Sequence, residues 1–319
     1  MWLKESPEGP LPYLDLVFQI PLKICYAALR FGLRIRTGKA GRASSIGLMR
    51  FRQFILKHHS ISYDLLQWFY SISLFAGKES KGAQDGRLIK IRVPKHNYQY
   101  YCRTGKGDFT PNREETIIEE FFKPKAGDVI IDVGAHIGRY TILGAKATGI
   151  TGKVVAIEAS PSNYYLLNRN VNLNGLKNVS TVNCAAFSWD NAIIKLYEPD
   201  VNASIYNTMM SARADVHHAK YVEVIGETLD TIVCKQGLPV SGINWIKIDV
   251  EGAELEVLKG ARGILSNSTS IALLVEVHDI KDPAHFGNIV NFLATFGFRL
   301  TQEIAYDTSG ERHVLFEKK

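Results

Sequence analysis

From Lys125 to the end of the chain, short apolar segments alternate with segments of helical periodicity. This alternation constrains the fold more than any other feature of the sequence. The apolar segments are near-continuous runs rich in Val, Ile and Leu, which is typical of strands buried on both faces of a sheet. Strands that alternate with helices predict an α/β fold with a doubly wound, mainly parallel sheet. Such sheets bind ligands beyond the carboxyl ends of their strands, so candidate functional residues are sought there.

The element boundaries follow from the same periodicity and from helix-capping residues. The expected strands are residues 129–133, 154–158, 181–184, 193–197, 245–249, 272–277, 298–303 and 313–317. The expected helices are residues 140–148, 161–174, 229–235, 253–265 and 286–296. Residues 198–221 are expected to be irregular. In front of the sheet we expect a β-hairpin over residues 88–103 and helices at residues 11–35, 47–58, 60–74 and 113–122.

The first motif lies at the end of strand 129–133, where Asp132 is followed by Gly134 and Gly138 in a turn that opens a helix. The glycines let the backbone approach a ligand at the helix N-terminus. A dinucleotide-binding loop leaves that N-terminus free for a pyrophosphate. Here a carboxylate repels a pyrophosphate and attracts a cationic amino-acid end or a sulfonium. A tight turn without a ligand is the alternative.

The second motif is Glu158, at the end of the next strand and 26 residues after Asp132. A carboxylate at this place holds a ribose diol with two hydrogen bonds. Together the two motifs indicate a nucleoside-bearing cofactor without phosphates, which S-adenosylmethionine fits and NAD fits poorly. The residues expected to contact this cofactor are Asp132, Gly134, Ala135, His136, Gly138, Glu158, Ala159 and Ala186.

Two further motifs supply candidate catalytic groups. Asp249 ends the fourth core strand, which should adjoin the first across the switch point, so Asp249 should face the reactive end of the cofactor. Glu251 follows it, where an acid at a helix start also stabilises the helix dipole. Glu276 and His278 end the next strand on one face, and an acid in an apolar strand is expensive unless partnered. We expect Glu254, Glu256 and Lys259 to be solvated helix positions.

The motifs together resemble a known family. The runs IDVGAHIGRYT, IEASP, ETLD, KIDVEGAELEVLKGA and LLVEVH are similar to those of the FkbM family of S-adenosylmethionine-dependent methyltransferases. The similarity extends from about residue 108 to the C-terminus, and Lys247–Ala261 is its most specific part. The resemblance implies the seven-stranded sheet of a class I methyltransferase, which is Rossmann-like, and methylation of a hydroxyl on a sugar, glycan or natural-product-like acceptor. His136 stands where the family usually has Asn.

Methyl transfer to a hydroxyl is an in-line displacement, to which the protein contributes alignment and removal of the hydroxyl proton. The candidate catalytic groups are Asp249 first, then Glu276 and His278, with Glu251 behind them. Lys247 lies one strand step back and is expected to fix Asp249 by charge pairing. The same groups have the composition of a divalent-cation site. The spacing alone assigns no metal, so a cation remains an alternative.

Other functions stay open at this level. They are an NAD-dependent oxidoreductase, a sheet that binds the cofactor without catalysis, and a membrane-tethered interaction protein. The sequence does not identify the acceptor or the oligomeric state. The scattered cysteines Cys25, Cys102, Cys184 and Cys234 indicate reduced thiols in a cytoplasmic protein rather than disulfides or a zinc cluster.

The charge divides the chain into two parts. Residues 1–100 carry 16 Lys and Arg against 6 Asp and Glu, whereas the other 219 residues carry 22 against 26. We therefore expect a basic helical extension over residues 1–85 and a methyltransferase domain over residues 86–319, with its core at 126–319. Within residues 11–35, a narrow polar stripe predicts either a helix packed in a small subdomain or an interfacial helix on the inner face of an anionic membrane. No nucleic-acid partner is expected, because no binding motif accompanies the charge.

Overall fold

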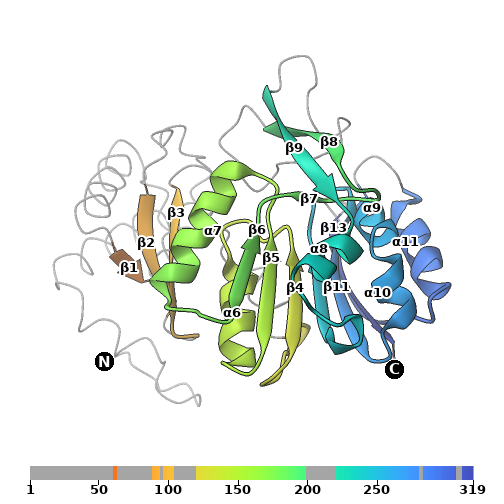
Figure 1. Cartoon of the computed structure of the whole chain (residues 1–319), viewed down its shortest axis with the longest axis horizontal. Coiled ribbons are helices and arrows are strands. Elements are labelled where there is room, and N and C mark those ends of the chain that lie inside the picture. The colour runs from red at the N-terminus through yellow and green to blue at the C-terminus, as the bar shows by residue number, and fades with distance from the viewer. Residues whose placement is uncertain are drawn as a thin grey trace, which may run out of the picture. The chain divides into compact units, whose positions relative to one another are not determined.

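The computed structural model of the chain describes residues 60–62, 88–93, 96–103, 120–198, 220–279, 283–306 and 311–318. The chain divides into two compact units, one made of Met1–His59 and Trp68–Glu79 and the other of Ser60–Gln67 and Ser80–Lys319. All described residues, which Figure 1 draws as coloured ribbon, belong to the second unit by their residue numbers. The helices expected at residues 11–35 and 47–58 lie outside them.

A seven-stranded sheet forms the centre of this unit, in the order β12-β13-β11-β10-β4-β5-β6 (Figure 1). Its strands are β4 (Val129–Val133), β5 (Lys153–Ile157), β6 (Val179–Val182), β10 (Trp245–Ile248), β11 (Ile271–His278), β12 (Arg299–Tyr306) and β13 (Glu311–Lys318). β13 runs antiparallel to both of its neighbours, and the pairs from β11 to β6 are parallel. β4 and β10 adjoin although 111 residues separate their ends, which makes their junction the switch point of the doubly wound sheet. The expected fold class is confirmed.

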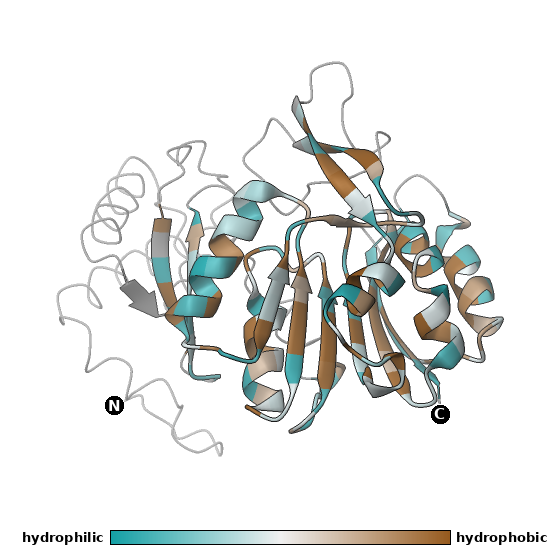
Figure 2. Ribbon diagram, in the orientation of Figure 1, coloured by the Kyte–Doolittle hydropathy of each residue, from teal (hydrophilic) through white to brown (hydrophobic). Residues whose placement is uncertain are grey.

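Helices cover both faces because the strand residues alternate between two cores. One set, including Ile131, Val155 and Leu273, packs with α8 (Leu229–Lys235), α9 (Glu254–Lys259), α10 (Arg262–Asn267) and α11 (His285–Ala294). The alternate residues pack with α6 (Arg139–Thr148) and α7 (Pro161–Leu173). Most residues of the central strands are hydrophobic (Figure 2). Because both faces are buried, a charged side chain in these strands requires a partner.

Local signals set the helix boundaries. The side chain of Ser160 accepts a hydrogen bond from the N–H of Asn163, and Pro161 opens α7 where a missing N–H costs nothing. Thr228 caps α8 in the same way. The expectation of one continuous helix over residues 253–265 is wrong, because the segment forms two helices, α9 and α10, which separate at Gly260. A Cβ at that position would lie 1.9 Å from the carbonyl oxygen of Phe187, so the chain passes too close there for any other residue.

Two smaller sheets flank the central one. β8 (Ala192–Glu198), β9 (Lys220–Glu227) and β7 (Ala185–Ala186) form a sheet that starts at the carboxyl edge of the central sheet, since β7 follows β6 (Figure 1). The strand expected at residues 181–184 is β6, which lies two residues earlier in the chain. β9 is not among the expected strands, and its sequence, KYVEVIGE, does not alternate strictly between apolar and polar residues. Most of the irregular stretch expected at residues 198–221 lies outside the described residues.

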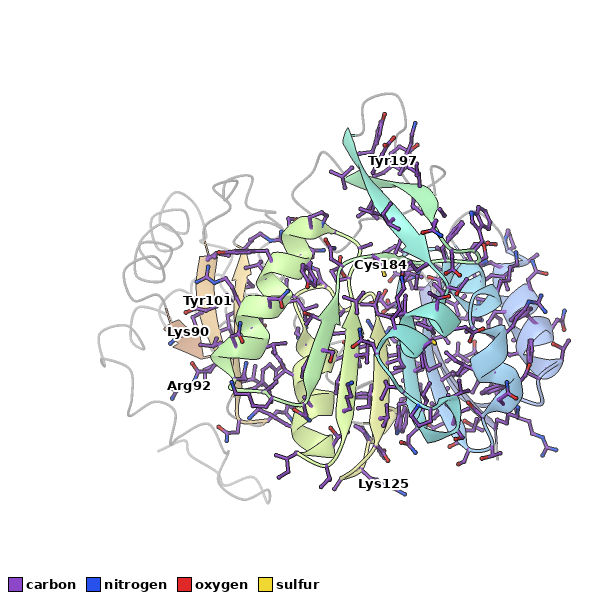
Figure 3. The ribbon with its side chains drawn as sticks, in the orientation of Figure 1. Lys90, Arg92, Tyr101, Lys125, Cys184 and Tyr197 are labelled. Atoms are coloured by element: carbon purple, nitrogen blue, oxygen red, sulfur yellow. The ribbon has the colours of Figure 1, made fainter. Side chains whose placement is uncertain are left out.

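The expected hairpin is confirmed as β2 (Leu88–Val93) and β3 (Tyr98–Arg103), which pair antiparallel. β1 (Ser60–Ser62) pairs parallel with β2, so the expectation of a helix beginning at Ser60 is wrong. The backbone N–H and C=O groups of β1 find hydrogen-bond partners in β2 instead of within a helix. The side-chain amide of Asn170 on α7 joins this sheet to the domain, bonding both the N–H and the carbonyl of Tyr101, which Figure 3 labels. No described helix is long and apolar enough to cross a membrane.

Gly134 marks the closest approach between the two strands at the switch point. Its φ is +72°, and a Cβ there would lie 1.8 Å from the carbonyl oxygen of Asp249. Its N–H donates to the carbonyl of Ile157, 3.0 Å away, so the turn after β4 is enclosed between the ends of β5 and β10. Only glycine fits this position.

We expect Gly134→Ala to reduce the free energy of unfolding by several kcal/mol, because the added methyl group forces β4 and β10 apart. Gly149→Ala is the matched control, since Gly149 also has a positive φ, of +66°, but has no atom within 4 Å of the added Cβ. It should cost only about 1–3 kcal/mol, the strain of a conformation, with ψ at −169°, that residues other than glycine rarely adopt. Urea denaturation of both variants measures the difference. Equal losses would contradict the close approach.

Candidate active site

Asp132 lies at the carboxyl end of β4 and is almost entirely buried. Thr141 on α6 donates a hydrogen bond to Oδ2, with an oxygen–oxygen distance of 2.5 Å. Oδ1 accepts no hydrogen bond from the described part of the chain and faces the ammonium of Lys247 at 3.6 Å. Burial raises the pKa of Asp132 above its ordinary value, against the opposing effects of Lys247 and Thr141. A buried acceptor oxygen therefore remains available at the mouth of this strand.

The ammonium group of Lys247 pairs with the carboxylates of both Asp132 and Asp249 at the switch point. Its Nζ donates to the carbonyl of Gly134 at 3.0 Å and to Oδ2 of Asp249 at 3.3 Å. It also lies 5.1 Å from the centre of the Tyr140 ring, within range of a cation–π contact. Burial disfavours the charge, but Asp249 and Asp132 outweigh burial and raise the pKa of Lys247. Lys247 is therefore cationic, and the charge pairing expected with Asp249 is present.

The turn after β4 is bonded to the end of β5. The N–H groups of Gly134 and Ala135 both donate to the carbonyl of Ile157, and the N–H of His136 donates to Oε2 of Glu158 at 2.8 Å. His136 has a φ of +51°, in the left-handed region that Asn and His tolerate better than most residues. The turn therefore requires at position 136 a residue that tolerates a positive φ. The N-cap of α6 is Gly138, whose φ is +94°.

Glu158 is buried, and backbone donors contact both of its oxygens. Oε1 accepts from the N–H of Ser160 at 2.9 Å, and Oε2 from His136. Burial raises the pKa of Glu158 above its ordinary value. The side-chain amide of Asn163 also donates to Oε1, at 3.4 Å. A carboxylate offers about four acceptor positions, so one remains for a ribose hydroxyl. Ala159 is half-buried and packs against a small apolar cluster beside this edge, whereas Ala186, in β7, is buried in the main core.

The expected catalytic groups converge on the other side of the switch point. Asp132, Lys247 and Leu274 are neighbours in register, so Asp249 and Glu276, two residues further along their strands, lie on the same face. Asp249, Glu276 and His278 each offer a ligand atom, and these atoms lie within 4.8 Å of one another. The charges of Lys247, His278 and His313 hold the pKa of Asp249 below its ordinary value, although burial opposes ionisation. Asp249 is therefore an ionised hydrogen-bond acceptor at neutral pH.

The sequence-based expectation for Glu254 is wrong, because this residue is fully buried. Its carboxylate accepts hydrogen bonds from the N–H of Gly252 at 2.8 Å and joins two histidine rings, His278 and His285, at 2.7 Å each. The histidines lower the pKa of Glu254 to about 2 in spite of burial. Glu256 and Lys259 form the half-exposed ion pair typical of a helix surface. The charge pattern of α9 offered no signal that separated Glu254 from Glu256.

Comparison with known proteins agrees with this geometry. Residues 132–300 match the model of the methyltransferase FkbM domain, and this match covers more than half of the chain. The chain belongs to the FkbM methyltransferase family. The buried acceptor at Asp132, the glycine turn and the carboxylate of Glu158 fit the cationic amino-acid end and the ribose of S-adenosylmethionine, the cofactor that the sequence resemblance implies. The sequence-based alternative of an NAD-dependent oxidoreductase is therefore set aside.

Two curated relatives resemble this FkbM family member. Methyltransferase 1 of Beauveria bassiana is 26% identical over 167 residues, which cover 46% of this chain and 66% of the relative. Methyltransferase sdnD of Sordaria araneosa is 30% identical over 156 residues, which cover 41% of this chain and 59% of the relative. The matches thus span 66% and 59% of the length of these relatives, in both cases less than two thirds.

Solved structures with a similar fold share little sequence. The methyltransferase FkbM of Methylobacillus flagellatus is 13% identical with a TM-score of 0.42, over 96% of this chain and 60% of that one. The TYW2 protein of P. horikoshii, solved in complex with MeSAdo, is 15% identical with a TM-score of 0.45, over 73% of this chain and 71% of that one.

Glu158→Gln should weaken S-adenosylmethionine binding by about 1.5–3 kcal/mol, because it replaces a charged acceptor with an amide. Calorimetric titration of the full chain measures this. Glu303→Gln is the control, since Glu303 is an exposed carboxylate on the edge strand β12, paired with Arg312. Unchanged affinity in Glu158→Gln would remove Glu158 from the cofactor site.

Proposed function

We propose that this family member is an S-adenosylmethionine-dependent O-methyltransferase that acts on a hydroxyl of a sugar, glycan or natural-product-like acceptor. The observation that carries the proposal is the group of Asp249, Glu276 and His278 at the carboxyl edge, beside the proposed cofactor turn. Carboxylates accept hydrogen bonds from hydroxyl groups and repel anionic acceptors. The site therefore favours an uncharged acceptor with several hydroxyls over a carboxylate or phosphate substrate.

In the proposed mechanism, the residues of this chain orient the acceptor and remove one proton. S-adenosylmethionine supplies a methyl group on a sulfonium, which an oxygen nucleophile attacks in line. Asp249 accepts the hydrogen bond of the attacked hydroxyl and takes its proton as the new bond forms. Lys247 keeps Asp249 ionised and fixed against the turn at Gly134. Glu276 and Glu251 bind the neighbouring hydroxyls of the acceptor.

Asp249→Asn tests the chemistry. The amide keeps the shape of the side chain and removes its basicity, so turnover should fall about 10²-fold or more while cofactor affinity changes little. The assay uses S-adenosylmethionine labelled in its methyl group against a panel of sugars and polyhydroxylated natural products. Asp128→Asn is the control, because Asp128 lies just before β4, at the opposite edge of the sheet.

Three outcomes of this assay discriminate the alternatives. Near-normal turnover of Asp249→Asn would transfer the role of the base to Glu276 or His278. Loss of activity with a chelator and its recovery with magnesium would favour the divalent-cation interpretation of the same cluster. Bound cofactor with no methylated product from any hydroxyl acceptor would contradict the O-methylation proposal.

The basic extension over residues 1–85 keeps its two sequence-based interpretations, since residues 11–35 lie outside the described residues. If the segment is an interfacial helix, the full chain should float with anionic vesicles, with each basic residue near the surface adding about 1 kcal/mol. If it is a packed helix, deletion of residues 1–40 should cause aggregation. Flotation with anionic and with neutral lipid, using both chains, separates the two. The membrane interpretation would place the acceptor on a lipid-linked or surface glycan.

A further inference from the structure

A buried Glu–His pair lies behind the proposed acceptor side of the site. Glu254 is the first residue of α9 and has no exposed surface. An isolated buried carboxylate is costly, and Glu254 is stabilised by Gly252, His278 and His285, from the preceding loop, β11 and α11. One carboxylate therefore fixes three segments that meet at the carboxyl edge.

The bond to Glu254 determines which way the His278 ring faces. Nδ1 of His278 is 2.7 Å from Oε1 of Glu254, so Nε2 points to the opposite side. There Nε2 lies 3.5 Å from Oε2 of Glu251 and 3.7 Å from Oε1 of Glu276. A histidine whose Nδ1–H is held by a carboxylate has a defined ring orientation, and its other nitrogen faces the site.

We propose that Glu254 is a positioning residue: it turns His278 so that Nε2–H donates a hydrogen bond on the acceptor side, between Glu251 and Glu276. His278 then does not serve as the base, and the hydroxyl proton passes to Asp249. This inference rests on the proposed function for its role in catalysis, while the orientation of the ring stands on the contacts alone.

The acidic groups around His278 favour a protonated imidazole, which can donate a hydrogen bond from Nε2. Four acidic groups face the His278 ring: Asp249 after β10, Glu251 in the next loop, Glu254 on α9 and Glu276 on β11. The basic groups near these acids are Lys247, His285 and His313. Burial alone would lower the pKa of His278, but Glu254 and Glu276 raise it to about 9. At neutral pH both ring nitrogens therefore carry protons.

The test is a pH titration of the histidine side chains by ¹⁵N NMR on the full chain, with His278→Asn used to assign the signal. In the wild type, His278 should have both nitrogens protonated at pH 7. In Glu254→Gln its titration midpoint should fall by about one pH unit or more, since the charged partner is lost. Glu256→Gln is the matched control on the same helix, because Glu256 bonds Lys259 and Ser188 instead. Its midpoint should equal that of the wild type.

Kinetics add an independent readout. Glu254→Gln should reduce turnover about tenfold on an acceptor that the wild type methylates, with cofactor affinity unchanged within about twofold. A wild-type His278 that titrates near 6.5, its ordinary value, overturns the proposal even if Glu254→Gln fails to fold. An unchanged midpoint in a folded Glu254→Gln variant also overturns it. Absence of methyl transfer by the wild type would contradict the proposed function and leave the NMR result to decide the positioning role.

Discussion

The ammonium group of Lys247 is buried among acceptors from three separate segments: the end of β4, the turn that follows it, and the end of β10. Asp132 and Asp249 come from neighbouring parallel strands, and two carboxylates this close would repel each other in a low dielectric. Lys247 compensates both and at the same time bonds the carbonyl of Gly134. The geometry of the cofactor turn and that of the proposed base therefore depend on one ion-pair network. A buried network of this kind is costly to break, because the remaining charges would have no partner.

The close approach at Gly134 and the buried Lys247 act together. The absence of a side chain lets the turn contact the backbone of Asp249, and this contact brings the Gly134 carbonyl within 3.0 Å of the ammonium. On the other side, β5 receives the N–H groups of the same turn, and Glu158 receives that of His136. Backbone hydrogen bonds thus hold the turn in place without a ligand. A preformed site loses less entropy when it binds.

On the side of the site where the methyl acceptor is proposed to bind, the buried carboxylate of Glu254 connects the elements, whereas backbone hydrogen bonds do so at the cofactor turn. Glu254 joins α9, β11 and α11 through His278 and His285, and Glu276 on β11 contacts His313 on β13 at 3.0 Å. These contacts link the two antiparallel neighbours β11 and β13 to the parallel core. The acidic and imidazole groups at this edge therefore form one electrostatic unit, in which His278 helps to lower the pKa of both Asp249 and Glu254.

The sequence by itself determined the class of the fold, the strands of the central sheet to within three residues, and the residues at the strand ends. It did so because burial on both faces leaves a continuous apolar run, and a charge that ends such a run is conspicuous. Asp132, Glu158, Asp249, Glu276 and His278 were all found in this way. Only the tertiary structure decided which acids of α9 are buried, because Glu254 and Glu256 have the same chemistry. It also decided the break at Gly260 and the approach at Gly134, since both depend on contacts between segments far apart in the chain.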